Sequence, residues 1–154
     1  MTSVVRAASV SDAATIHATV IDAWKATVDP RSSGHRLTVA DVTQLLTTGG
    51  GFVAEADGEV VGCVLWAVED GSVELMKLAV LPPARGTGVG PALVEAVADV
   101  ARAQGVPQVL LAVSRYSPRL VQWYAALGFT ESPTAVYSHA APTSPPPTVM
   151  VRAV

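Results

Sequence analysis

The chain is short of the residues on which several kinds of protein site depend. One cysteine, Cys63, cannot form an internal disulfide, and three histidines spread along 154 residues give no metal-ligand spacing, so we expect no metal. Ten Lys and Arg against thirteen Asp and Glu give a formal net charge of −3 without a basic run, which argues against a nucleic-acid partner. No window has the length of an uncharged membrane span, and no leader-like segment opens the sequence, so we expect no membrane partner and a cytoplasmic location.

The chain is rich in small apolar residues. Hydrophobic residues make up 50% of it and charged residues only 15%. A chain of this length can bury a core without metals or disulfides. We therefore predict one domain over residues 1–154, with a core built largely from alanine and valine.

Local signals predict an alternation of helices and strands. Two Ser/Thr-x-x-Asp pairs have the spacing of helix caps, and two Asp-Gly pairs between β-branched runs predict hairpin turns. The expected strands are Val4–Arg6, Phe52–Ala56, Glu59–Glu69, Ser72–Val80, Val109–Val113, Val136–His139 and Val149–Arg152. The expected helices run from Ser9 to about Thr27, from Thr38 to the glycines at 49–51, from Pro91 to Gln104 and from Pro118 to Leu127.

The resulting order is β-α-α-β-β-β-α-β-α-β-β. A helix lies between the strand ending at Val80 and the strand beginning at Val109, so this unit is a βαβ crossover and its strands should be parallel. The other strands should be antiparallel. The sequence therefore predicts a mixed α/β sheet with helices on both faces.

A glycine-rich turn follows the strand that ends at Val80. Leu81-Pro82-Pro83 cannot continue a ladder, and Arg85-Gly86-Thr87-Gly88-Val89-Gly90 then opens a helix. The backbone N–H groups at a helix start have no partners within the helix and favour an anion, so the segment predicts a pyrophosphate cradle. It lacks the lysine of a nucleoside-triphosphate loop and the spacing of a dinucleotide fold. A tight turn without a ligand is the alternative.

Two motifs resemble the GNAT family of N-acetyltransferases. The first runs from Leu78 to Gly90 and is followed by an amphipathic helix; the second is Gln122-Trp123-Tyr124-Ala125-Ala126-Leu127-Gly128-Phe129. Together they span about a third of the chain, and the predicted element order fits the family throughout. The resemblance implies an acyl-CoA N-acyltransferase fold, a mostly antiparallel sheet with a splayed parallel pair, and acetyl-CoA as co-substrate.

The resemblance also implies which residues bind the co-substrate. Main-chain groups near Leu78 and Val80 would pair with the pantetheine arm, and the N–H of Val80 or a neighbour would hold the thioester carbonyl. Arg85 would cap the phosphates or brace the turn, and Ser117 stands where the family often has a longer-reaching asparagine. The full set is Leu78, Ala79, Val80, Arg85, Gly86, Thr87, Gly88, Val89, Gly90, Pro91 and Ser117.

Two residues are candidates for proton transfer. The family places a tyrosine like Tyr124 beside the CoA sulfur, where a phenol could protonate the departing thiolate; a tyrosine that only packs, with a water as the acid, is the alternative. Glu74 is the candidate base, and strand alternation would put it on one face with Met76, Leu78 and Val80. Its alternative is an ion pair with Lys77 or with an arginine. Cys63 has no paired base in the sequence and is interpreted as buried filler.

The acceptor side is less defined. Trp24 and His35 are the candidate acceptor-binding residues, because the family's acceptor site is lined by the loop between the first two helices. We expect a small-molecule or peptide amine as acceptor and a possible homodimer through the last hairpin. A non-catalytic acyl-CoA-binding regulatory domain, and a transferase with another acyl chain or a hydroxyl acceptor, are the alternative functions.

Overall fold

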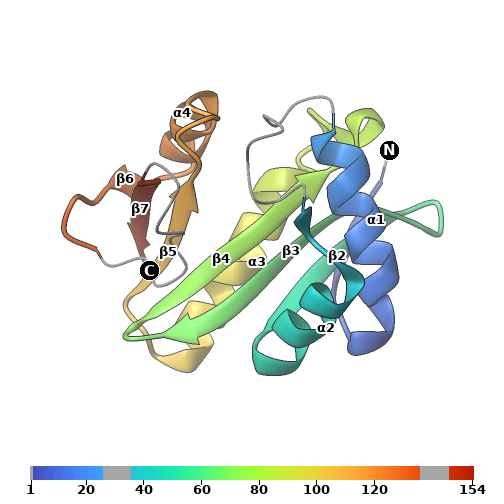
Figure 1. Cartoon of the computed structure of the whole chain (residues 1–154), viewed down its shortest axis with the longest axis horizontal. Coiled ribbons are helices and arrows are strands. Elements are labelled where there is room, and N and C mark those ends of the chain that lie inside the picture. Colours follow the sequence, from blue (N-terminus) through green and yellow to red (C-terminus); the bar gives the residue numbers. More distant parts are fainter. Residues whose placement is uncertain (1, 26–35, 136–145) are drawn as a thin grey trace.

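The computed structural model describes residues 2–25, 36–135 and 146–154 (Figure 1). Its strands are β1 (Val4–Ala7), β2 (Gly50–Ala56), β3 (Glu59–Glu69), β4 (Ser72–Val80), β5 (Gln108–Val113), β6 (Thr130–Glu131) and β7 (Thr148–Ala153). Its α-helices are α1 (Ala13–Trp24), α2 (Val39–Thr48), α3 (Val89–Gln104) and α4 (Arg119–Ala126), with short 3-10 turns at Val10–Asp12 and Pro82–Ala84.

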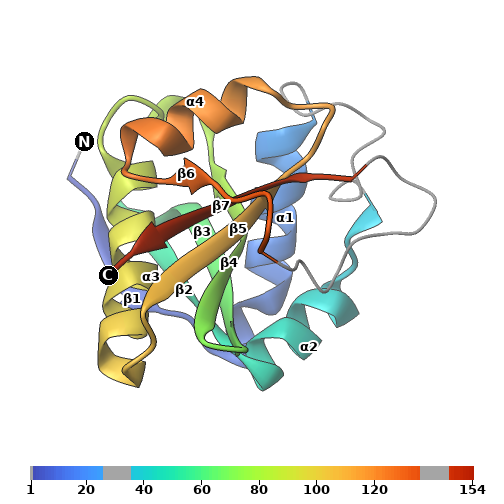
Figure 2. The same cartoon turned by 90° about the vertical axis from the view of Figure 1, so that its left-hand side faces the viewer.

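The seven strands form one sheet in the order β1-β2-β3-β4-β5-β7-β6. β4 and β5 are parallel, and the other neighbouring pairs are antiparallel. Helices α1 and α2 cover one face of the sheet, and a cluster of buried apolar side chains lies between them and the strands. Helix α3 covers the other face over a second such cluster, so the sheet is the middle of three layers (Figure 2). The predicted mixed α/β sheet with helices on both faces is confirmed.

The hairpin turns form as their sequence predicts. Asp57 and Gly58 both have positive φ, at 53° and 78°, and Asp70 and Gly71 have 41° and 80°. Two successive positive φ angles are the geometry of a two-residue hairpin turn, which Asp-Gly accepts readily. These turns bring β2, β3 and β4 side by side as a meander.

The last hairpin differs in part from the expectation. β7 pairs with β5, and the partner on its other side is the two-residue strand Thr130–Glu131. The predicted strand Val136–His139 lies outside the described residues. No helix in the described ranges is long and apolar enough to span a bilayer.

A β-bulge interrupts the pairing of β3 with β4. Met76 is paired with Leu65 and Ala79 with Cys63, so two residues of β4 stand opposite one residue of β3. Lys77, the first of the two, has a φ of 54°, in the left-handed region. An extra residue in one strand bends it and shifts the side chains that follow.

The bulge makes the predicted face alternation of β4 wrong. Met76 packs with the cluster under α1 and α2, whereas Leu78 and Val80 pack with the cluster under α3. Glu74 therefore does not share one continuous face with Leu78 and Val80. The alternation rule fails because the extra residue at the bulge moves every later side chain to the opposite face.

Candidate active site

β4 and β5 separate soon after they begin. They pair only through Ser72, Val73 and Glu74 with residues 108–110, and the side chain of Gln108 donates to the Ser72 hydroxyl at 3.0 Å. Within the described chain, the rest of β4 has no partner strand on this side. The predicted splay is thus present, and the free edge of β4 can offer main-chain groups to an extended ligand.

The glycine-rich turn presents a row of unused amides at the end of β4. Gly86 and Gly88 have φ of 77° and 90°, and α3 begins at Val89. Among the described residues, no acceptor is found for the N–H groups from Gly86 to Gly90. A Cβ added at Gly86 or Gly88 would meet nothing within 4 Å, so the space beside the turn is open. Open space and unpartnered N–H groups at a helix start suit a phosphate group.

Gly90 has a different task in the same turn. A Cβ there would lie 3.0 Å from Cζ2 of Trp123, so the absence of a side chain lets α4 approach the start of α3. The Trp123 ring also meets the Tyr124 ring edge-on, with centroids 5.0 Å apart. Trp123 is 37% exposed, and its ring packs against the start of α3 at Gly90.

Arg85 is engaged by the protein itself. Its Nε donates to the carbonyl of Val80 at 3.0 Å, and its Nη2 donates to the carbonyl of Ala23 in α1 at 2.8 Å. Thr87 donates its hydroxyl to the carbonyl of Ala84 within the same turn. Of the two roles expected for Arg85, bracing of the turn is the one this geometry displays, and a phosphate contact stays a prediction.

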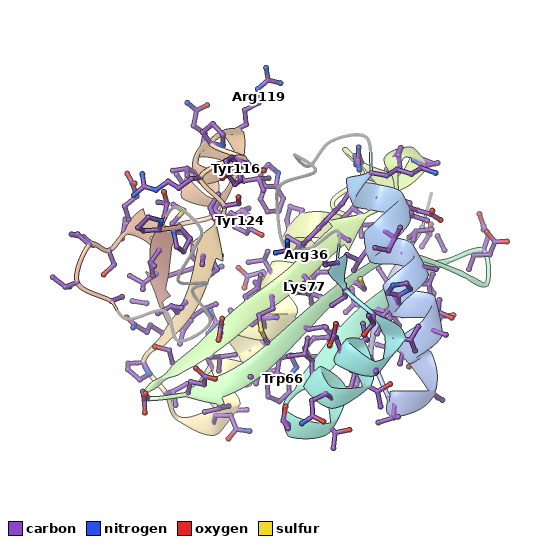
Figure 3. The ribbon with its side chains drawn as sticks, viewed as in Figure 1. Arg36, Trp66, Lys77, Tyr116, Arg119 and Tyr124 are labelled. Atoms are coloured by element: carbon purple, nitrogen blue, oxygen red, sulfur yellow. The ribbon has the colours of Figure 1, made fainter. Side chains whose placement is uncertain are left out.

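Tyr124 lies on the α4 side of the separation between β4 and β5 (Figure 3). Its side chain is buried, and its ring meets Phe129 edge-on at 5.6 Å between centroids. Burial raises the pKa of its phenol well above the usual value, because the charged form would lose its hydration. The phenol therefore stays protonated at neutral pH and can donate a proton, as an acid for a thiolate must.

Glu74 stands where the two strands begin to separate. It is the last residue of β4 that pairs with β5, opposite Leu110, and only 3% of it is exposed. Burial lowers the pKa of the nearby Lys77 ammonium, and the negative charge of Glu74 acts in the opposite direction. A buried carboxylate near the vertex of the separation can accept a proton from a group bound there, directly or through water.

The thiol of Cys63 is not available as a nucleophile. The side chain is fully buried, and burial raises its pKa to about 12. The thiolate is the reactive form, so such a cysteine is inert at neutral pH. Its interpretation as buried filler agrees with this environment.

The candidate acceptor-binding residue Trp24 lies against the bulge. The indole N–H of Trp24 donates to the carbonyl of Leu78 at 3.2 Å, and the Lys77 ammonium lies 5.9 Å from the centroid of the Trp24 ring. His35 lies outside the described residues. Ser117 is half-buried in the turn before α4, where its N–H donates to the carbonyl of Ser114.

Sequence reasoning missed Lys77 as a site residue of its own. It considered this lysine only as an ion-pair partner for Glu74, and no ion pair joins the two. The available signal was a single charge in the apolar run Leu75-Met76-Lys77-Leu78-Ala79-Val80. No group of three or more His, Cys, Asp or Glu side chains that could hold a metal occurs among the described residues.

The mixed sheet, its splayed parallel pair and the amide-lined turn define an acyl-CoA-dependent transferase. The family model described as "Acetyltransferase (GNAT) family" matches residues 19–129. An IAA acetyltransferase of Azospirillum brasilense is 33% identical over 114 residues, which cover 72% of each chain. An uncharacterized N-acetyltransferase of Mycobacterium tuberculosis is 36% identical over 87 residues, or 56% of each chain.

Solved structures agree with this assignment at the level of the fold. The PaiA N-acetyltransferase of Thermoplasma acidophilum, solved in complex with coenzyme A, superposes over the whole of both chains with a TM-score of 0.81 at 17% identity. The chain belongs to the GNAT acetyltransferase family, and acetyl-CoA is its co-substrate.

Proposed function

We propose that this chain acetylates an amine of a small molecule or peptide by direct attack on acetyl-CoA in a ternary complex. The observation that carries the proposal is the buried side chain of Tyr124 beside the separation of β4 and β5. The amides of residues 86–90, which have no acceptor among the described residues, lie beyond the end of β4. One end of this separation suits a phosphate, and its middle suits a thioester. Residues 1–154 would act as a single domain.

Each candidate residue has one task in this mechanism. Acetyl-CoA supplies an activated acetyl group as a thioester. The N–H of Val80 or a neighbour would stabilise the carbonyl oxygen as it gains charge. Glu74 would accept the proton that the attacking amine loses, and Tyr124 would donate a proton to the sulfur as the C–S bond breaks. Because Cys63 is buried and protonated, no acetyl-enzyme step is part of the proposal.

The remaining candidates would position the two substrates. The free edge of β4 at Leu78–Val80 would pair with the pantetheine amides, and Ser117 would contact the arm from the opposite side. The turn from Gly86 to Pro91 would hold the pyrophosphate. Trp24 and His35 would line the acceptor side.

The test combines binding and turnover. Calorimetry with acetyl-CoA measures binding, and release of free thiol with a broad amine panel measures transfer. We expect both, whereas a non-catalytic acyl-CoA-binding domain would bind acetyl-CoA and release no thiol with any amine.

The acid role of Tyr124 has its own experiment. Tyr124→Phe keeps the ring contacts with Trp123 and Phe129 but removes the proton. We expect kcat to fall by about 10²–10⁴-fold, with the affinity for acetyl-CoA within about twofold of the original. Full turnover in this variant would show that water, rather than the phenol, protonates the thiolate.

A further inference from the structure

Both the backbone conformation and the burial of Lys77 are unfavourable for a lysine. Its φ of 54° is one that glycine adopts freely and that strains a lysine. The side chain is half-buried between Met76 and Leu78, and burial lowers the pKa of its ammonium. Strained backbone and a desolvated charge on the same residue are features that cluster at functional sites.

The ammonium of Lys77 is not neutralised by a direct partner. In the described part of the chain it makes no hydrogen bond and no ion pair, and its recorded contact is the Trp24 ring at 5.9 Å. The carboxylates whose charges act on it are Asp41 and Glu74. Asp41 is already used to cap α2, where it accepts from the Thr38 N–H at 3.0 Å. An ammonium has three donors, so the site can accept an anionic ligand.

Lys77 lies close to the place where the proposed acetyl transfer would occur. It lies in the stretch of β4 that has no β5 partner, three residues before Val80. In Figure 3 the labelled side chains of Lys77 and Arg36 lie on the β4 side of the separation, and Tyr124 and Tyr116 lie on the α4 side. A group held by Lys77 would therefore be close to an amine that attacks a thioester in this separation.

We propose that Lys77 binds a carboxylate of the acceptor, so that the substrate class is amines that also carry a carboxylate near the amine, as in amino acids. This inference rests on the N-acetyltransferase reaction proposed above. Lys77 forms no covalent bond in it: the amine nitrogen bonds to the acetyl carbon, the C–S bond breaks, and the amine proton leaves to Glu74 or water. A positive charge nearby also lowers the pKa of the acceptor amine, which favours its neutral, reactive form.

The test compares amino acids with their amides as acceptors. Leucine with leucinamide and phenylalanine with phenylalaninamide differ in the carboxylate and share the side chain. The readout is the acid-to-amide ratio of kcat/KM at a fixed pH, compared between the original protein and Lys77→Met. The two amines of a pair have different pKa values, but this difference is the same for every variant and cancels in the comparison.

We expect Lys77→Met to lower the acid-to-amide ratio by about ten- to a hundredfold, since one charge-assisted hydrogen bond is lost. Lys77→Arg should keep most of the preference. Lys25 is the other lysine of the chain, with a side chain that is 70% exposed, so Lys25→Met is the matched control and should leave the ratio unchanged. Thermal unfolding and the affinity for acetyl-CoA report whether each variant is folded.

Two results would overturn the inference and leave the proposed function standing. One is an equal acid-to-amide ratio in the original protein and Lys77→Met; the other is turnover confined to amines without a carboxylate. Failure to release thiol with any amine, despite acetyl-CoA binding, refutes the proposed function itself. If Lys77→Met does not fold, Lys77→Gly gives the same readout, because glycine suits the φ of 54°.

Discussion

Gly88 and Gly71 offer a matched pair of substitutions that separates backbone strain from ligand binding. Their φ angles are 90° and 80°, and a Cβ added at either would meet nothing within 4 Å. Alanine at each position should therefore cost only the strain of the left-handed conformation, about 1–2 kcal/mol. For a chain of this size that loss corresponds to a fall in Tm of roughly 2–8 °C in both variants.

The two variants should differ in their affinity for acetyl-CoA. Gly88 is the N-cap of α3 and one of the residues whose N–H groups have no acceptor among the described residues. A methyl group there would occupy the open space that the pyrophosphate is proposed to fill, and relaxation of the strained φ would turn the amides away. We expect Gly88→Ala to weaken binding by about ten- to a hundredfold, the value of one charge-assisted hydrogen bond. Gly71→Ala, in the turn between β3 and β4, should bind normally.

Calorimetric titration with acetyl-CoA and a thermal melt of each variant measure both effects. The reasoning predicts similar Tm losses with unequal affinities. Equal affinities would refute the assignment of the pyrophosphate to this turn, whatever the melts show. A larger Tm loss for Gly88→Ala than for Gly71→Ala would instead show that the turn makes stabilising contacts that its open geometry does not reveal.

Three further predictions concern groups around this site and its scaffold. Cys63 should not react with a thiol reagent at pH 8 until the protein unfolds, because burial raises its pKa to about 12; rapid labelling of the native state would contradict this. The hydrogen bond from the Arg6 guanidinium lowers the pKa of Asp12 to about 2. This interaction therefore stabilises the fold at pH values above the usual aspartate pKa, and its contribution disappears as the pH falls toward 2. Asp12→Asn should accordingly lower the free energy of unfolding by about 1 kcal/mol at pH 7 in urea titrations and by nothing near pH 2; a pH-independent difference would assign the effect to packing. If Arg85 braces the turn, Arg85→Met should lower Tm and raise KM for acetyl-CoA and for the acceptor alike. If Arg85 instead only contacted the phosphates, the same substitution would raise the KM for acetyl-CoA alone and leave Tm unchanged.

The features that the sequence predicts well are those set by neighbouring residues. The Thr38 and Asp41 pair forms the expected cap, with Asp41 N–H donating to the Thr38 hydroxyl at 3.1 Å. The Asp-Gly turns form because their φ requirements are met within two residues. The parallel neighbours β4 and β5 follow from the handed crossover through α3. These elements fix the place of the glycine-rich turn without any knowledge of distant contacts.

The features that the sequence does not predict depend on residues far apart in the chain. Arg85 reaches the carbonyl of Ala23, 62 residues away, and no local pattern indicates that partner. The bulge at Lys77 is equally hidden, because apolar residues on both sides suit a continuous strand and lysine is not a residue that marks positive φ. The prediction that Glu74 shares a face with Leu78 and Val80 failed for this reason.

The end of α1 connects the two halves of the candidate site. The indole N–H of Trp24 donates to the Leu78 carbonyl at the bulge of β4, and one residue earlier the Ala23 carbonyl accepts from Arg85 of the glycine-rich turn. Arg85 in turn bonds the carbonyl of Val80, between these two points on the chain. A shift at the end of α1 would therefore move the bulge and the turn together. The proposed acceptor side at Trp24 and Lys77 is connected to the turn proposed to hold the co-substrate, because the same helix end is bonded to both.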